Sequence, residues 1–348
     1  MSAVWYYVFT LVFFLFDYFI LAMGLNIQYG ETGILNFAYF AFVAVGAYVT
    51  GAVSLPNSVG TGQHYILGWG IPFPFNLLLG GIATSLLAVL LAFITLRRLR
   101  TDYLAMVLIS SSLILYDICN NFVPLFNGAD GLYNVPPPFA SALKLTTNSF
   151  IPFFAAVTGV IALLMWFVMS RITRSPLGRT FRAIRDDDAV AAALGKNVFR
   201  SQLKSMVIGS FYAGIGGGLI IQFAGSLNPS AWLPGETFVV FAVIIVGGVG
   251  NNVGLLVGSL LVETLLVHLT QFLPAIPGHP SLIEYIDAML IGVFLMVMLW
   301  FRPQGVVPER PRQSATMVRY LGKRGRGKNE APIEVDVPDV ALNDGSLP

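Results

Sequence analysis

The chain has 348 residues, of which 56% are hydrophobic and only 11% are charged, and its mean hydropathy is +0.75. This composition excludes an ordinary soluble globular protein, because such proteins carry about 25% charged residues. A single cysteine, Cys119, excludes an intrachain disulfide and a cysteine-based metal site. The histidines, His64, His268 and His279, lack the spacing of helical metal ligands. Lipid must therefore be the solvent for most of the chain.

Long apolar stretches follow one another along the chain, and each predicts a membrane-spanning helix. Such a helix needs about 20 residues to cross the hydrocarbon core. The predicted spans are 3–24, 33–54, 75–96, 103–123, 151–170, 205–224, 237–248, 253–273 and 284–301. The seventh is short and runs into Gly247, Gly248 and Gly250, which favours a broken or re-entrant helix. The sequence predicts an all-α polytopic membrane protein with about eight or nine transmembrane helices.

The positions of the basic residues predict the orientation. All but one of the 20 lysines and arginines fall in three segments, 97–100, 171–204 and 302–328. In membrane proteins the short cytoplasmic loops carry an excess of lysine and arginine. An even number of predicted spans separates each basic segment from the next, so all three can lie on the cytoplasmic side. The N-terminus is then extracytoplasmic, or cytoplasmic if 33–54 is re-entrant. We expect a membrane domain over 1–307 and a cytoplasmic tail, largely disordered, over 308–348, where the chain is polar and poor in aromatic residues.

The polar segment 171–204 interrupts the apolar chain and is interpreted as its one large cytoplasmic loop. Within it, Asp186–Gly195 (DDDAVAAALG) predicts a short helix. Aspartates suit the positive end of the helix dipole, alanines favour helix, and a glycine closes it. Such a loop is where a membrane domain meets a soluble partner.

A few polar side chains lie inside the predicted spans. Asp17 and Glu263 are the deepest carboxylic acids by residue count, and Ser111 lies in the middle of TDYLAMVLISSSLILYD. An ionisable group at membrane depth costs about 2.5–3.5 kcal/mol on insertion scales, so a function is a reasonable expectation. The three residues either line a polar pathway or are bonded locally, to a neighbouring helix or, for the serine, to its own helix.

Glycines recur at GxxxG spacing as Gly214 with Gly218 and as Gly254 with Gly258. This spacing lets helices approach closely. The sequence leaves open whether the partner helix belongs to the same chain or to another one, and it favours the same chain.

The common catalytic motifs are absent from the sequence. There is no GxxxxGK[ST] loop, HExxH or GxSxG motif. We therefore expect no enzyme activity, no catalytic residue, no metal site and no cofactor in this chain, and no ATP hydrolysis through a phosphate-binding loop.

Five blocks of the sequence, in order, resemble the permeases of branched-chain amino acid ABC transporters. They are the glycine-patterned segment 30–51; DYLAMVLI followed by NGADGL; SPLGRTFRAIRDDDAVAAALGKNVFRSQLKSMVIGSFYAGIGGGLI; NPSAWLPGETFVVFAVIIVGGVGNNVGLLVGSLLVE; and LIGVFLMVMLWFRPQGVVPERP. Only the C-terminal tail and the connection near 55–74 lie outside the resemblance.

The resemblance implies a permease subunit that forms the membrane pathway of an importer in the bacterial plasma membrane, with a cytoplasmic C-terminus. It also implies the partners. A second, similar permease chain completes the pathway, two ATPase subunits bind ATP at the cytoplasmic face, and an extracytoplasmic solute-binding protein delivers the solute.

The family's coupling segment maps onto Ala189–Gly195, with aspartates just upstream where glutamate is usual. Its small residues imply docking of a helix in a groove of the ATPase. Arginines upstream are expected to pair with acidic groups of the ATPase or with lipid phosphates. The residues implied in coupling are Arg182, Arg185, Asp187, Asp188, Ala192 and Gly195.

Two alternatives remain at this stage. Relatives with the same architecture take up urea or short amides, so the solute is open. An ion-coupled secondary transporter acting alone would instead use Asp17, Glu263 or Asp287 as a proton or cation site. Transport without any partner chain would distinguish it.

Overall fold

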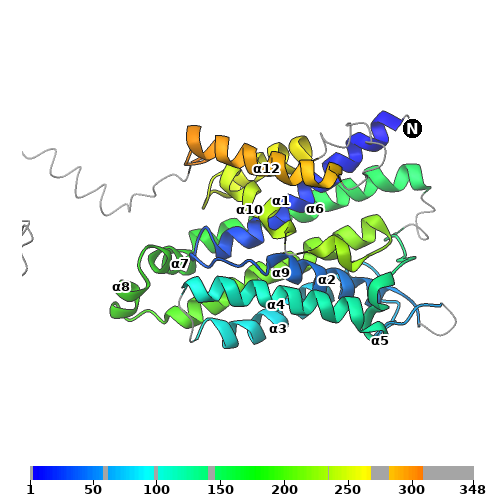
Figure 1. Cartoon of the computed structure of the whole chain (residues 1–348), viewed down its shortest axis with the longest axis horizontal. Helices are drawn as coiled ribbons and strands as arrows, with labels where there is room; N and C mark the ends of the chain where they lie inside the picture. The colour runs from blue at the N-terminus through cyan, green and yellow to red at the C-terminus, as the bar shows by residue number, and fades with distance from the viewer. Residues whose placement is uncertain are drawn as a thin grey trace, which may run out of the picture. The chain divides into compact units, whose positions relative to one another are not determined.

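The computed structural model describes residues 3–57, 62–97, 101–139, 146–233, 235–267 and 282–308. Every regular element in these ranges is helical, apart from two isolated bridges, Tyr65 with Phe126 and Leu132 with Leu227. The elements, shown in Figure 1, are α1 (Ala3–Gln28), α2 (Tyr39–Ser54), α3 (Phe75–Thr95), α4 (Thr101–Asn121), α5 (Val123–Phe126), η1 (Gly128–Asp130), α6 (Thr147–Arg174), α7 (Pro176–Asp186), α8 (Asp188–Ala193), α9 (Val198–Ala224), η2 (Pro229–Trp232), α10 (Glu236–Gly247), α11 (Asn252–Ser259), η3 (Leu260–Val267) and α12 (Leu282–Phe301).

The predicted all-α membrane architecture is confirmed. By length and composition, six stretches of the described residues suffice to cross a membrane: Val4–Gln28, Phe75–Thr95, Tyr103–Asn121, Ser149–Arg174, Val198–Ala224 and Pro229–Gly247. Shorter apolar helices cover Tyr39–Ser54, Asn252–Val267 and Met289–Phe301. Each predicted span therefore contains a helix, although the predicted 33–54 becomes helical only at Tyr39. The end of the predicted span 253–273 and the tail beyond 308 lie outside the described residues.

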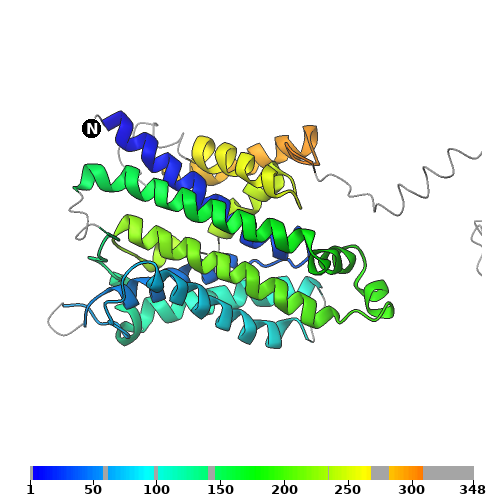
Figure 2. The same ribbon diagram turned by 180° about the vertical axis from the view of Figure 1, so that it is seen from behind.

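Helix α9 lies at the centre of the bundle, against α1, α2 and α3 (Figures 1 and 2). Its glycines allow this packing. A Cβ atom placed on Gly217 would lie 2.0 Å from the Val43 carbonyl oxygen, and one on Gly214 would lie 2.8 Å from the Cα of Gly81. A Cβ on Gly218 would meet Leu77 and Thr50. The Gly214–Gly218 pair thus serves packing within the chain, as the sequence favours.

Helices α10 and α11 form a tight hairpin. With 12 residues, α10 rises only about 18 Å, which is short of the ~30 Å hydrocarbon core, so the predicted short helix is observed. It turns at Gly248, whose φ of 116° suits glycine. A Cβ on Gly258 would lie 2.0 Å from the Val243 carbonyl oxygen, so this glycine also packs within the chain.

The start of α1 and the α7–α8 segment lie at opposite ends of the bundle (Figures 1 and 2). We call the end that carries α7 and α8 the basic end, and the other the outer end. If the basic end is cytoplasmic, this arrangement agrees with an extracytoplasmic N-terminus, the first of the two predicted orientations.

Candidate functional site

The polar segment between α6 and α9 is mostly helical, because its own side chains cap short helices. The Ser175 hydroxyl accepts a hydrogen bond from the Leu177 N–H at 3.2 Å, at the start of α7. The Asp187 carboxylate accepts one from the Val190 N–H at 2.9 Å, at the start of α8. Such caps satisfy N–H groups that have no partner within the helix. The predicted short helix is confirmed, and α7 precedes it.

Helix α8, at the tip of the polar segment between α6 and α9, has exposed apolar side chains. Gly195, at φ +79°, closes the helix and donates its N–H to the Ala192 carbonyl at 2.9 Å. Leu194 is 75% exposed and Val190 54% exposed, and Asp188 and Ala192 are exposed beside them. The sequence predicts a docking face from small residues and misses Val190 and Leu194. Their spacing of four residues on a short polar-flanked helix was the available signal.

Two arginines of α7 tie this segment to the end of α1. Arg182 Nη1 lies 2.7 Å from Glu31 Oε2 and also donates to the Thr173 carbonyl at 3.3 Å. Arg185 Nη1 donates to the Gly30 carbonyl. Glu31 is buried, with 2% of its surface exposed. The sequence expects both arginines to face an ATPase or lipid phosphates, whereas the structure engages both within the chain.

The predicted pathway carboxylates Asp17 and Glu263 are both buried, on α1 and η3. Neither Asp17 oxygen has a hydrogen-bond partner among the described residues. The carboxylate faces α9, where a Cβ on Gly216 would lie 3.6 Å from Asp17 Oδ1. A role of Asp17 or Glu263 in the pathway stays a prediction.

The neighbouring serines of α4 differ in their surroundings. Ser111 Oγ donates to the Val107 carbonyl at 2.8 Å, within its own helix, so its predicted pathway role rests on the sequence alone. Ser112 is 2% exposed, and its hydroxyl has no partner among the described residues. Ser112 lines a pocket that the sequence does not reveal, because helical periodicity alone does not say which serine faces inward.

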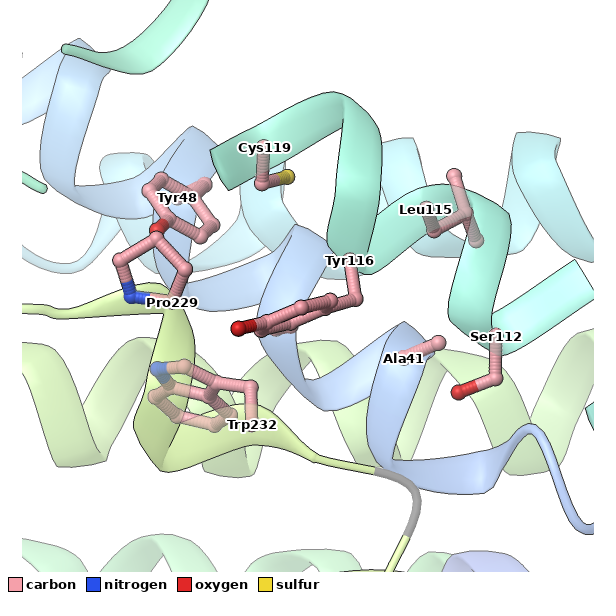
Figure 3. Close-up of a pocket in the computed structure, with 9 residues that line it drawn as sticks. Ala41, Tyr48, Ser112, Leu115, Tyr116, Cys119, Pro229 and Trp232 are labelled. Carbon is pink, nitrogen blue, oxygen red and sulfur yellow. The ribbon is translucent and has the colours of Figure 1, made fainter. Parts of the chain in front are cut away.

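The pocket lies between α2, α4 and the segment around η2 (Figure 3). Its cavity of about 10 Å³ is roughly the room one water needs. Besides Ser112, Tyr48 Oη and Trp232 Nε1 are buried without a partner among the described residues. Residues that line the pocket include Ala41, Ala44, Tyr48, Ser112, Cys119 and Trp232.

One wall of the pocket is η2, a single turn of 3-10 helix that follows a non-helical stretch of backbone after α9. After α9, Leu227 pairs with Leu132, and the chain then turns back along α2. The Trp232 ring centroid lies 5.7 Å from that of Phe40, and Thr237 Oγ1 accepts the Phe40 N–H at 3.1 Å. Phe40 is in the first turn of α2. Irregular backbone at membrane depth is tolerated only where protein covers it or where it lines a cavity.

Comparison with known proteins finds related permeases. A family model described as "Branched-chain amino acid transport system / permease component" matches residues 7–299. The permease LivM of a high-affinity branched-chain amino acid transport system of Salmonella typhimurium is 28% identical, over 90% of this chain and 71% of its own length.

A probable branched-chain amino acid permease LivM of Methanocaldococcus jannaschii is also 28% identical, over 84% of this chain and 91% of its own length. The high-affinity branched-chain amino acid permease LivH of Salmonella typhimurium is 24% identical, over 83% of this chain and 91% of its own length. No solved structure gives a significant match.

Proposed function

Since the chain belongs to the family of permease components of branched-chain amino acid transport systems, we propose that it forms the membrane pathway of an ATP-binding-cassette importer for branched-chain or similar aliphatic amino acids. The observation that carries the proposal is the family match over residues 7–299, almost the whole membrane domain. The LivM and LivH relatives belong to branched-chain amino acid transport systems, which favours these solutes over urea or short amides.

Separate ATPase subunits power the importer by docking on α8. The exposed Val190 and Leu194 suit a helix-in-groove contact, in which an amphipathic helix lays apolar side chains into a groove. The Arg182–Glu31 pair then connects the docked segment to α1, so movement of the ATPases is transmitted into the bundle. The ATP is bound by those subunits, and this chain contributes no cofactor.

The remaining partners follow from the same proposal. Relatives of both the LivM and the LivH kind match the chain, which supports pairing with a second, similar permease. An extracytoplasmic solute-binding protein delivers the solute at the outer end. The complex lies in the bacterial plasma membrane, with the C-terminus of this chain in the cytoplasm.

The first test is purification of the tagged chain in mild detergent, with the accompanying chains identified by mass. We expect an ATPase and a second permease. The purified complex is then placed in liposomes with ATP at the ATPase face and labelled leucine with the binding protein at the other.

Uptake that requires ATP supports the proposal. A chain that purifies alone and transports without ATP contradicts it and supports an ion-coupled carrier. ATP-driven uptake of urea or amides but not of leucine refutes only the choice of solute.

A further inference from the structure

We propose that the pocket between α2, α4 and η2 holds the solute in transit, with Tyr48 and Trp232 donating hydrogen bonds to its carboxylate. The inference rests on the proposed function and adds a binding site within this chain. Figure 3 shows the pocket walls, with Tyr48 and Pro229 toward one end and Ala41 and Ser112 toward the other.

The first argument is the set of polar atoms without partners. Tyr48, Ser112 and Trp232 are 1%, 2% and 5% exposed. Their Oη, Oγ and Nε1 atoms have no hydrogen-bond partner among the described residues. A buried polar atom without a partner is destabilising, and few occur in native proteins. Three around one cavity, contributed by three separate segments, indicate a polar occupant that completes them.

A second cavity in the molecule shows the opposite pattern. The groove between α3, α6 and α9 is larger, at about 390 Å³. Its polar side chains, however, are bonded inside the protein: Ser85 Oγ donates to the Gly81 carbonyl at 2.8 Å, and Tyr212 Oη to the Met165 carbonyl at 2.7 Å. This groove offers only apolar contact, so size alone does not identify the solute site.

The chemistry of the smaller pocket suits an aliphatic amino acid. Among the described residues no charged side chain lines it. Its uncommitted polar groups are hydroxyls, which can donate to a carboxylate and accept from an ammonium group, and one indole N–H, which donates. A carboxylate accepts such bonds, and they strengthen where water is excluded. Ala41 and Ala44 of α2 and Leu115 of α4 offer apolar contact to the aliphatic part. The Tyr116 ring lies between the two ends of the pocket in this conformation (Figure 3), so it turns aside when the solute is bound.

The pocket is too small for the solute in this conformation. Its cavity of about 10 Å³ has room for about one water and not for an amino acid. One wall is α4, which exposes Met106, Ile114 and Ile118 on its other face, and another is the short 3-10 helix η2, which contains Trp232. Displacement of one of these walls opens the pocket during the transport cycle, and closure returns it to the form seen here.

The test uses single-atom and near-isosteric variants in the complete importer. For Tyr48→Phe and for Trp232→Phe, we expect ATP-driven leucine uptake, measured well below saturation, to fall about ten-fold, as for the loss of one hydrogen bond to a charged group. For Tyr48→Phe the melting temperature in detergent should stay the same or rise, because an unsatisfied buried group is removed while the ring is kept. Trp232→Phe also removes buried ring volume, so its uptake is compared at equal amounts of folded complex.

Tyr212→Phe is the matched control, since its hydroxyl is bonded inside the protein. It should show the reverse pattern, a lower melting temperature with unchanged uptake efficiency. Normal uptake by both pocket variants in an importer whose parent transports leucine overturns the inference and leaves the proposed function intact. A parent complex with no ATP-driven leucine uptake refutes the proposed function itself.

Cys119, the only cysteine of the chain, lines the same pocket and allows a second measurement by chemical labelling. A small maleimide should react with Cys119 during turnover and block uptake, and leucine with its binding protein should slow the reaction. A rate of Cys119 labelling, followed by mass, that is the same with and without leucine contradicts the inference.

Discussion

Asp17 is the residue on which the proposed function and its ion-coupled alternative differ most directly. It is fully buried on α1, with no hydrogen-bond partner for either oxygen among the described residues. Asp17→Asn keeps the shape and removes the ionisable group. Because no hydrogen bond is lost and ATP supplies the energy, we expect uptake within about two-fold of the parent.

Uptake by this variant is measured with and without a proton gradient across the liposome membrane. Loss of uptake together with loss of a response to the gradient would indicate a proton site at Asp17 and contradict the importer.

Adjacent serines of α4 provide a matched pair. Ser111 Oγ is bonded to the Val107 carbonyl, whereas Ser112 Oγ points into the pocket without a partner among the described residues. We expect Ser111→Ala to leave leucine uptake unchanged and Ser112→Ala to reduce it about three-fold or more, as for one hydrogen bond of ~1 kcal/mol. Uptake rates of the two variants at equal expression decide the matter; equal effects would count against the pocket.

Between elements, the Arg182–Glu31 pair joins α7 to the end of α1. Glu31 is buried and Arg182 mostly so, with side chains 3% and 20% exposed. Arg182→Met removes the cation that lies 2.7 Å from the buried Glu31 carboxylate, which costs up to about 3–5 kcal/mol. We expect a lower melting temperature and weaker stimulation of the ATPase by solute.

The double variant Arg182→Met with Glu31→Met separates charge burial from packing. Because both charges are removed, we expect it to recover part of the lost stability. A double variant less stable than the sum of the single ones would mean that the pair is not the main connection between α7 and α1.

The tip formed by α8 is where an ATPase docks under the proposed function. Ala192 is exposed, so Ala192→Arg should fold and insert normally but lose solute-stimulated ATP hydrolysis, because the long charged side chain does not fit an apolar groove. Ala183→Arg, on the exposed face of α7, is the control. A complex that contains this variant should keep normal solute-stimulated ATP hydrolysis. Retained coupling in Ala192→Arg would remove α8 from the ATPase interface.

At the scale of the whole molecule, close packing of α9 is what holds the bundle together. A Cβ on Gly214 would lie 2.3 Å from Thr84 Oγ1, so Gly214→Ala overpacks the centre and should cost about 1–3 kcal/mol. Gly292 of α12 has no neighbouring atom within 4 Å among the described residues. Gly292→Ala should therefore be neutral or stabilising by about 0.5–1 kcal/mol, as for glycine in a helix. Melting temperatures of the two variants test the contrast.

The molecule also separates its functions along its length. Under the proposed function, the segment that docks the ATPase, α7 and α8, lies at the basic end (Figure 1). The pocket lies between α2, the second half of α4 and η2. The proposed function needs such a separation, because solute enters at one face while ATP is hydrolysed at the other.

The sequence by itself determined the membrane class, the helical stretches, the short seventh helix and the helix near Asp186–Gly195. These depend on properties that are local along the chain: a run of about 20 apolar residues, a capping aspartate or a closing glycine. Tertiary structure decided the rest. Arg182 bonds to Glu31, which is 151 positions away in the sequence. Tyr48, Ser112 and Trp232 line one pocket from three separate segments. Composition and periodicity do not encode which buried groups face one another, since that depends on how helices distant in sequence pack.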